Sequence, residues 1–152
     1  MATVLGDEID VLAKAKRAIG GDYVPSDAEE YMSEAQLDYY RRLLQEWKKL
    51  ILVAAQDTLQ SLQDGPIREP DLNDRASSET DWGIELRTRD RQRKLIAKID
   101  SALRRIEEGE YGYCEVTGEP IGLGRLSARP IATMTVEAQE AHERREKISR
   151  DD

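Results

Sequence analysis

Four positions in the carboxy-terminal third have the spacing of a zinc-binding site, although only one of them is a cysteine. Cys114 and Thr117 are separated by two residues, and Thr135 and Ala138 repeat this spacing after seventeen intervening residues. Four cysteines in this pattern would bind structural zinc through their thiolates. Threonine and alanine provide no thiolate, and His142 is the only histidine in the sequence, so we predict no tightly bound zinc. Five apolar residues are expected to stabilise the segment instead: Leu123, Leu126, Ile131, Met134 and Val136.

Two carboxylates, Asp71 and Asp74, lie in the stretch 66–77, which separates two long helical patterns. At the end of a long arm, an acidic tip of this kind could reach a basic or metal-bearing surface deep inside a partner. The pair could also hold Mg²⁺ for phosphoryl chemistry, but the neighbouring sequence offers no evident third ligand or base. Taken without further information, the pattern favours a simpler role, in which the two residues initiate turns or cap the second helix.

The stretches on either side of this pair predict two long helices. Neither Gly nor Pro occurs from residue 33 to 64, so a helix here could extend on the order of 45–50 Å before Gly65 and Pro66 end it. Its apolar residues recur at alternating steps of three and four, a heptad seam: Leu37, Tyr40, Leu44, Trp47, Ile51, Ala54 and Thr58. The second helix is predicted from about 77–80 to Glu108, with an inward stripe of Trp82, Leu86, Ile96, Ile99, Leu103 and Ile106.

Two helices of similar length joined by about a dozen residues should pack as an antiparallel hairpin. Arg89 and Arg93 lie near the seam, which weakens the case for a dry interface there. The predicted fold class is therefore mainly α, with a long antiparallel coiled-coil hairpin that projects from a small globular head. A helical bundle, with the amino-terminal helix as its third member, is the alternative.

The remaining segments are expected to build the head. An amphipathic helix is predicted over 4–19, Ser26 to Glu29 has the form of a capping box for a further helix, and the glycines and prolines after Gly109 favour turns and short strands. Thr133 or Thr135 is expected to cap the last helix. The predicted parts are an amino-terminal helix and linker (1–32), the hairpin (33–109, tip 67–78), a degenerate zinc-finger module (110–134) and a carboxy-terminal helix (135–152).

Composition narrows the function. The net charge of −8 argues against a protein that mainly grips nucleic acid, because phosphate binding depends on clustered Lys and Arg, although 87–105 is locally basic. A single cysteine cannot form an internal disulfide, the acidic amino terminus does not read as a signal peptide, and no apolar run approaches the roughly 20 residues needed to span a bilayer. We therefore expect a soluble cytoplasmic protein with a protein partner and no membrane contact.

Several stretches resemble the DksA/TraR family: 71–77 (DLNDRAS), 85–96 (ELRTRDRQRKLI), 111–114 (YGYC) and 121–130 (IGLGRLSARP). The resemblance extends from about Tyr23 to Glu143 and includes the elements at 23–25 and 30–32. It implies a monomeric transcription regulator, not an enzyme, whose hairpin enters the secondary channel of bacterial RNA polymerase without binding DNA directly. Together with the alarmone ppGpp, such a protein changes open-complex stability at stringently controlled promoters, including those of ribosomal RNA.

The same resemblance assigns roles to residues. It implies a regulatory tip of Asp71, Asp74, Arg75 and Ala76, polymerase contacts at Arg87 and Arg91, and ppGpp contacts at Leu95, Lys98 and Arg129. Lys98 and Arg129 are suitable phosphate ligands, although on charge alone they would pass for ordinary surface residues. Two departures stand out: three of four finger cysteines are missing, as in zinc-free variants, and Gln139 replaces a lysine that many members carry near the alarmone.

Two other functions compete with this reading. In a Gre-like factor, Asp71 and Asp74 would hold Mg²⁺ and promote transcript cleavage. In a plain coiled-coil scaffold, a face of the hairpin would bind the partner and the tip would be dispensable. Direct DNA binding through the arginine-rich helix is disfavoured by the net charge.

Overall fold

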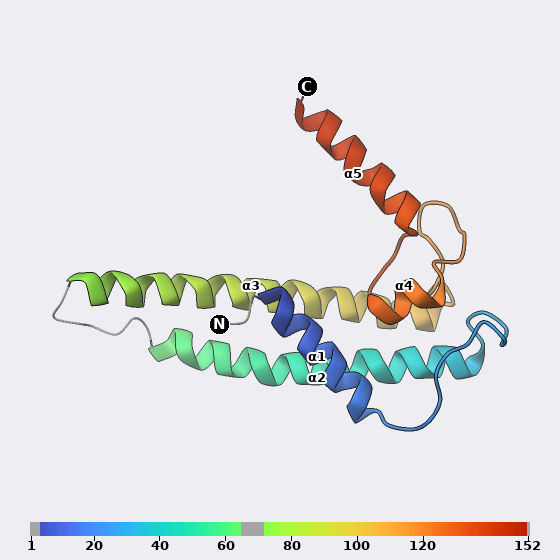
Figure 1. The fold of residues 1–152 in the computed structure, drawn as a ribbon, viewed down its shortest axis with the longest axis horizontal. Coiled ribbons are helices and arrows are strands. Elements are labelled where there is room, and N and C mark those ends of the chain that lie inside the picture. The colour runs from blue at the N-terminus through green and yellow to red at the C-terminus, as the bar shows by residue number, and fades with distance from the viewer. Residues whose placement is uncertain (1–3, 65–71, 152) are drawn as a thin grey trace. The chain divides into compact units, whose positions relative to one another are not determined.

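The structure is a computed structural model that describes residues 4–64 and 72–151. Over these ranges the chain forms five helices: α1 (Val4–Ala18), α2 (Glu34–Asp64), α3 (Leu72–Glu108), α4 (Leu123–Ala128) and α5 (Val136–Asp151) (Figure 1). The described residues contain no β-strand, and one isolated antiparallel bridge joins Tyr113 to Pro120. None of the described helices is long and apolar enough to cross a membrane.

The chain divides into two compact units. The first unit combines residues 1–20 with 45–99, and the second combines 21–44 with 100–152. Helix α1 therefore groups with the end of α2 and most of α3, while the finger segment groups with the beginning of α2 and the end of α3. Leu12 and Ala15 of α1 are buried, so one face of this helix is covered.

Contacts between α2 and α3 show that the two long helices run antiparallel. In the first unit, the indole Nε1 of Trp82 donates a hydrogen bond to the carbonyl oxygen of Leu62 at 3.2 Å. In the second unit, Arg41 Nε lies 3.4 Å from Glu107 Oε1. The end of α2 therefore meets the beginning of α3, and the beginning of α2 meets the end of α3. The mainly helical fold with a long antiparallel hairpin is confirmed.

The heptad seam of α2 is largely correct, whereas the stripe of α3 was placed wrongly toward its amino-terminal end. Five of the seven predicted seam residues of α2 are buried: Tyr40, Leu44, Trp47, Ile51 and Thr58. On α3 the buried row runs through Leu95, Ile99, Ala102 and Ile106, while Leu86 is 44% exposed. Leu95 lies nine positions after Leu86, which places the two about 180° apart around a helix with 3.6 residues per turn.

Two predicted helix starts were also wrong. α3 begins at Leu72, before the predicted 77–80, so much of the predicted tip has helical backbone. Ser26 does pair with Glu29, whose carboxylate accepts its backbone N–H at 3.3 Å, but no helix follows. Met32 has a φ of 54°, outside the helical region, so no helix passes through it. Helix α2 starts after Ser33, whose hydroxyl oxygen accepts the N–H of Gln36.

The core of the second unit is built around tyrosines. Tyr111 is 2% exposed and its hydroxyl donates to the carbonyl of Pro130 at 2.7 Å, and its ring centroid lies 5.6 Å from that of Tyr40. Leu123, Leu126 and Ile131 are buried as predicted, but Met134 is half-buried and Val136 is 45% exposed. Val136 is the first residue of α5, and Ala138 in place of Val136 is the buried apolar residue at the start of this helix.

Tyr31 and Met32 clamp the finger segment at Gly112. The Tyr31 hydroxyl donates to the carbonyl of Gly112 at 2.7 Å and accepts the N–H of Gly122 at 2.9 Å. Gly112 has a φ of 90°, and a Cβ added there would lie 2.6 Å from Met32 Sδ. The short strands predicted after Gly109 do not form in the described residues, because positive φ angles at Gly112 and other glycines bend the chain into turns.

This clamp predicts that Gly112→Ala destabilises the protein more than Gly118→Ala. Both glycines have positive φ, so each substitution carries a backbone cost of about 1 kcal/mol. At Gly118 an added Cβ meets nothing within 4 Å, whereas at Gly112 it forces Met32 to move, which adds about 1–3 kcal/mol. Urea unfolding of the two variants measures the difference. Equal losses of stability would show that Met32 does not hold Gly112.

Candidate functional site

The predicted tip lies where α3 begins. Asp71 is outside the described residues, while Asp74, Arg75 and Ala76 belong to the first turns of α3, with helical backbone. Their backbone is therefore part of a helix and not of the loop that the sequence predicted. The tip-proximal part of α3 is linked to α2 by Trp82, whose contact with Leu62 was missed at the sequence level. Its indole N–H was the available signal, because a half-buried tryptophan usually finds a hydrogen-bond partner.

The cations in the basic stretch of α3 differ in whether they form an ion pair with Asp90. Arg87 and Arg91 are exposed and four residues apart, so they share one face of the helix. Arg93 and Lys94 both bind Asp90, at 3.1 and 3.0 Å. The pKa of the Asp90 carboxyl is below its usual value, mainly because of the hydrogen bond and the charge of Lys94. Arg93 makes a smaller contribution in the same direction. The two residues predicted to contact polymerase therefore present their charge to solvent.

The three predicted ppGpp residues have different environments. Leu95 is buried in the seam of α3, so its side chain packs inside the hairpin, while Lys98 on the next turn is exposed. Arg129 is exposed at the carboxy-terminal cap of α4 in the second unit, where its backbone N–H donates to the carbonyl of Arg125 at 2.7 Å. Gln139 Nε2 donates to Glu143 Oε1 at 3.1 Å on α5. Lys98 and Arg129 are thus available as cationic ligands.

The finger segment folds into a tight turn around Cys114. The backbone N–H of Cys114 donates to the carbonyl of Glu119, and the N–H of Gly118 donates back to the carbonyl of Cys114, both at 2.8 Å. The N–H of Glu115 reaches the carbonyl of Thr133 at 2.8 Å, which joins the two halves of the degenerate finger. The thiol itself is 3% exposed.

The surroundings of Cys114 lower the pKa of its thiol. Burial by itself raises the pKa of this thiol. Hydrogen bonding by the Thr117 hydroxyl and by the backbone N–H groups of Thr117, Thr135 and Val116 has the larger, opposite effect, so the pKa falls from the ordinary 9.0 to about 7. These donors stabilise the negative form of the sulfur. Two of them, from Thr117 and Thr135, come from positions that would carry cysteines in a four-thiolate site. The role of Thr117 was also missed, because nothing in its neighbours along the sequence indicates that its hydroxyl meets sulfur.

The residues at the four finger positions do not fit zinc. Thr135 Oγ1 accepts the backbone N–H of Ala138 at 3.2 Å and caps α5, and the Ala138 methyl group is buried. The Thr117 hydroxyl oxygen accepts the N–H of Glu119 at 3.2 Å besides serving the sulfur. Among residues 4–64 and 72–151, no group of three or more His, Cys, Asp or Glu side chains could hold a metal ion. Cys114 is the single soft ligand at these positions.

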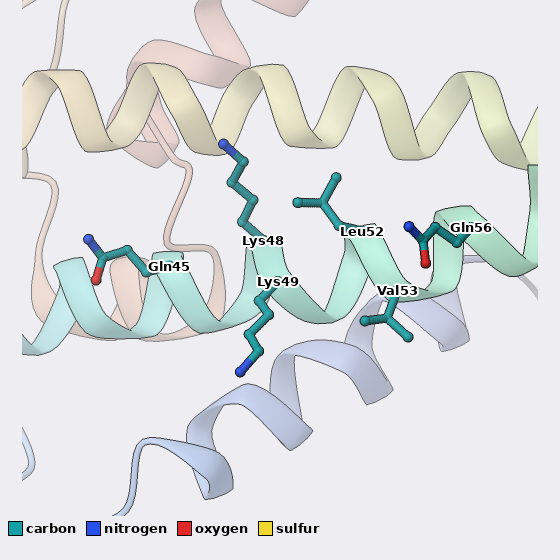
Figure 2. A pocket seen from close by; sticks show the side chains of 6 residues that line it. All are labelled: Gln45, Lys48, Lys49, Leu52, Val53 and Gln56. Atoms are coloured by element: carbon teal, nitrogen blue, oxygen red, sulfur yellow. The ribbon is translucent and has the colours of Figure 1, made fainter.

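A shallow hollow on α2 lies within the first unit. Figure 2 shows Lys48 and Leu52 on the side of α3, and Lys49 and Val53 on the side of α1. Leu52 and Val53 are 45% and 56% exposed. Gln45 and Gln56 complete the lining, which holds no acid, cysteine or histidine. Lys48 and Lys49 are therefore its ionisable groups.

Comparisons with known proteins agree over most of the chain. Residues 36–106 match the family described as DnaK suppressor protein DksA, N-terminal domain, and residues 109–144 match the prokaryotic dksA/traR C4-type zinc finger. The RNA polymerase-binding transcription factor DksA of Caulobacter vibrioides is 62% identical over 131 residues, 86% of this chain and 92% of that protein. The Escherichia coli protein of the same name is 42% identical over 125 residues, covering 82% and 83%. The structure of transcription factor DksA2 from Pseudomonas aeruginosa superposes with a TM-score of 0.69 at 40% identity, covering 92% of this chain and 98% of that chain.

The environment of Cys114 predicts a pH-dependent stability. Because the folded pKa of about 7 is below the ordinary 9.0, the folded state holds the thiolate more tightly, and the free energy of unfolding should rise with pH between about 7 and 9. Thr117→Val removes a donor, so it should raise the thiol pKa and flatten this rise. Thr133→Val is the control, since its hydroxyl donates to Glu115 and not to sulfur. Urea unfolding across this range and thiolate absorbance near 240 nm measure both effects, and an unchanged pKa in Thr117→Val would contradict the assignment.

Proposed function

Because this chain belongs to the DksA/TraR family, we propose that it is a transcription factor that binds bacterial RNA polymerase. The observation that carries the proposal is the 62% identity to a relative named for this activity, over 92% of that relative's length. The likeness includes both family segments, the long helices and the finger. Transcription regulation, and not catalysis, is the function that the relatives' names support.

We propose that the hairpin enters the secondary channel and places its tip near the polymerase active centre. The length of the helices supports this: α2 has 31 residues and α3 has 37. At about 1.5 Å per residue, such helices reach roughly 45 Å or more. Arg87 and Arg91, exposed on one face of α3, would contact acidic residues of the polymerase. The tip residues Asp71, Asp74, Arg75 and Ala76 would then alter open-complex stability at stringently controlled promoters.

We propose that ppGpp acts as co-regulator through Lys98 and Arg129. Both side chains are exposed cations, and guanidinium and ammonium groups suit phosphate oxygens. Leu95, which is buried, would contribute by holding the turn of α3 that carries Lys98. Gln139 brings no positive charge and is hydrogen-bonded to Glu143, so the response to ppGpp should be weaker than in relatives with a lysine there.

The remaining features of the proposal follow from charge and packing. With a net charge of −8, the factor should reach promoters through polymerase and not by gripping DNA. We propose that it acts as a cytoplasmic monomer and that its finger segment is folded without zinc. Cys114 is the sole thiolate at the four finger positions, and the surrounding donors already engage its sulfur, which supports the last point.

We predict that the tip carboxylates act after docking. Asp74→Asn should leave polymerase affinity within several-fold of the wild-type value, because the contacts of the hairpin are intact, and should abolish the effect on open-complex lifetime at a ribosomal RNA promoter. Glu79→Gln removes a charge from an exposed position of the same helix and should leave both quantities unchanged. Equal loss of binding and regulation in Asp74→Asn would make this residue an anchor. Factor-dependent shortening of RNA in stalled complexes would instead indicate cleavage.

We predict that Lys98→Ala and Arg129→Ala mainly remove the ppGpp-dependent part of the effect. Each charge-assisted phosphate contact contributes roughly 1.5–3 kcal/mol, or about ten- to a hundredfold in ppGpp affinity. Lys94→Ala is a matched control, because Lys94 is exposed on the same helix but bound to Asp90. Run-off transcription over a ppGpp titration measures the shift. The alarmone assignment fails if both variants respond as wild type does.

A further inference from the structure

The carbonyl groups at the carboxy-terminal end of α2 need hydrogen-bond donors from outside the helix. The last four carbonyls of a helix have no acceptor role within the helix itself, and α2 ends at Asp64, so Leu62 carries one of them. No basic residue lies in the last turn of α2 to bind these oxygens.

Trp82 of α3 supplies a donor to this helix end. Its indole Nε1 donates to the Leu62 carbonyl at 3.2 Å, although the two residues are twenty apart in the sequence. Side chains on a helix lean toward its amino terminus, so the Trp82 ring leans toward the tip end of the hairpin. Asp74 lies eight residues earlier on the same helix, about 12 Å along its axis. The bond therefore joins α2 to the part of α3 that carries the tip.

Apolar packing is weak in this part of the hairpin, which makes a directional bond important. On α2, Thr58 is the one buried residue between 52 and 64, and its hydroxyl donates to Ala54 within its own helix at 3.1 Å. On α3, no residue from 79 to 94 is buried. A seam without buried apolar side chains does not by itself determine how far one helix is shifted along the other. A hydrogen bond between a side chain and a backbone carbonyl does.

We propose that Trp82 is a positioning residue for the tip: its indole N–H caps α2 at Leu62 and thereby fixes the axial position of the first turns of α3, which carry Asp74. This inference rests on the proposed function, in which the tip changes open-complex lifetime. Trp82 is half-buried, and the proposal gives it no contact of its own with polymerase or promoter, so it acts through the geometry of the tip.

The chain contains its own control for this idea. Trp47, the other tryptophan, is 4% exposed and its Nε1 has no hydrogen-bond partner among the described residues. Replacing Trp47 by Phe therefore removes an unused N–H together with buried volume, whereas replacing Trp82 by Phe removes an N–H that caps α2. Trp47→Phe should cost more stability, because it opens a cavity in the core. Only Trp82→Phe should disturb the tip.

The test compares Trp82→Phe, Trp47→Phe, Asp74→Asn and the wild-type chain in three measurements. These are polymerase affinity, the maximal change of open-complex lifetime at saturating factor, and amide hydrogen exchange in residues 72–80 of the free protein. For Trp82→Phe we expect affinity within several-fold of wild type, a several-fold smaller maximal effect, and exchange faster by about three- to tenfold, the loss that one neutral hydrogen bond implies. Trp47→Phe should melt at a lower temperature but keep the full maximal effect and wild-type exchange in 72–80.

Two results would overturn the positioning role. One is a full maximal effect of Trp82→Phe at saturation, whatever its affinity, because a purely structural defect is overcome by more factor. The other is unchanged hydrogen exchange in 72–80. Failure of the proposed function looks different: the wild-type chain itself would then leave open complexes unaffected, and Asp74→Asn would match it. In that case the exchange measurement still decides whether Trp82 holds α3 in place.

Discussion

The sulfur atom of Cys114 organises the finger segment of the second unit. The Thr117 hydroxyl and backbone N–H groups in both halves of that segment, including that of Thr135, lower the pKa of the Cys114 thiol. In a four-thiolate finger a metal ion would join these halves, and the metal would be part of the folding free energy. Here the backbone N–H of Glu115 donates to the carbonyl of Thr133, which joins the two halves directly. Contacts of this kind between backbone groups support the proposal that the finger folds without zinc.

Side chains that pack around the turn at Cys114 hold the beginning of α2 and the end of α3 in the second unit. Tyr40 of α2 and Ile106 of α3 are buried in the second unit together with Tyr111 and Leu126. The hydroxyl groups of Tyr111 and Tyr40 bond to Pro130 and Ser127, so the aromatic core is also satisfied in its polar atoms. Tyr31 adds two backbone bonds to Gly112 and Gly122. The finger segment therefore acts as the platform on which the ends of α2 and α3 are fixed, and its folding affects the hairpin directly.

The sequence predicted burial correctly where apolar residues follow a single helical repeat without interruption. The steps of three and four on α2 placed Tyr40, Leu44, Trp47 and Ile51 in the core, because burial follows the helix repeat. On α3 the same reasoning failed at Leu86, since few apolar residues lie between it and Leu95 to hold the phase. The capping box at Ser26 formed its bond without a helix, because Met32 leaves the helical region of backbone space. Local signals predicted local bonds and not the length of the element.

The candidate site divides in the same way. Exposure of Arg87, Arg91, Lys98 and Arg129 agrees with roles as contact residues, whereas the burial of Leu95 follows from the seam. The donors around Cys114 and the Trp82 cap join residues that are distant in the sequence, so no spacing rule reveals them. We propose that hydrogen bonds and apolar packing hold this finger in place of zinc. Elemental analysis of the purified chain, together with its melting temperature with and without a strong chelator, tests it most directly. We predict less than stoichiometric zinc and an unchanged melting temperature; stoichiometric zinc, or unfolding on chelation, would contradict the account.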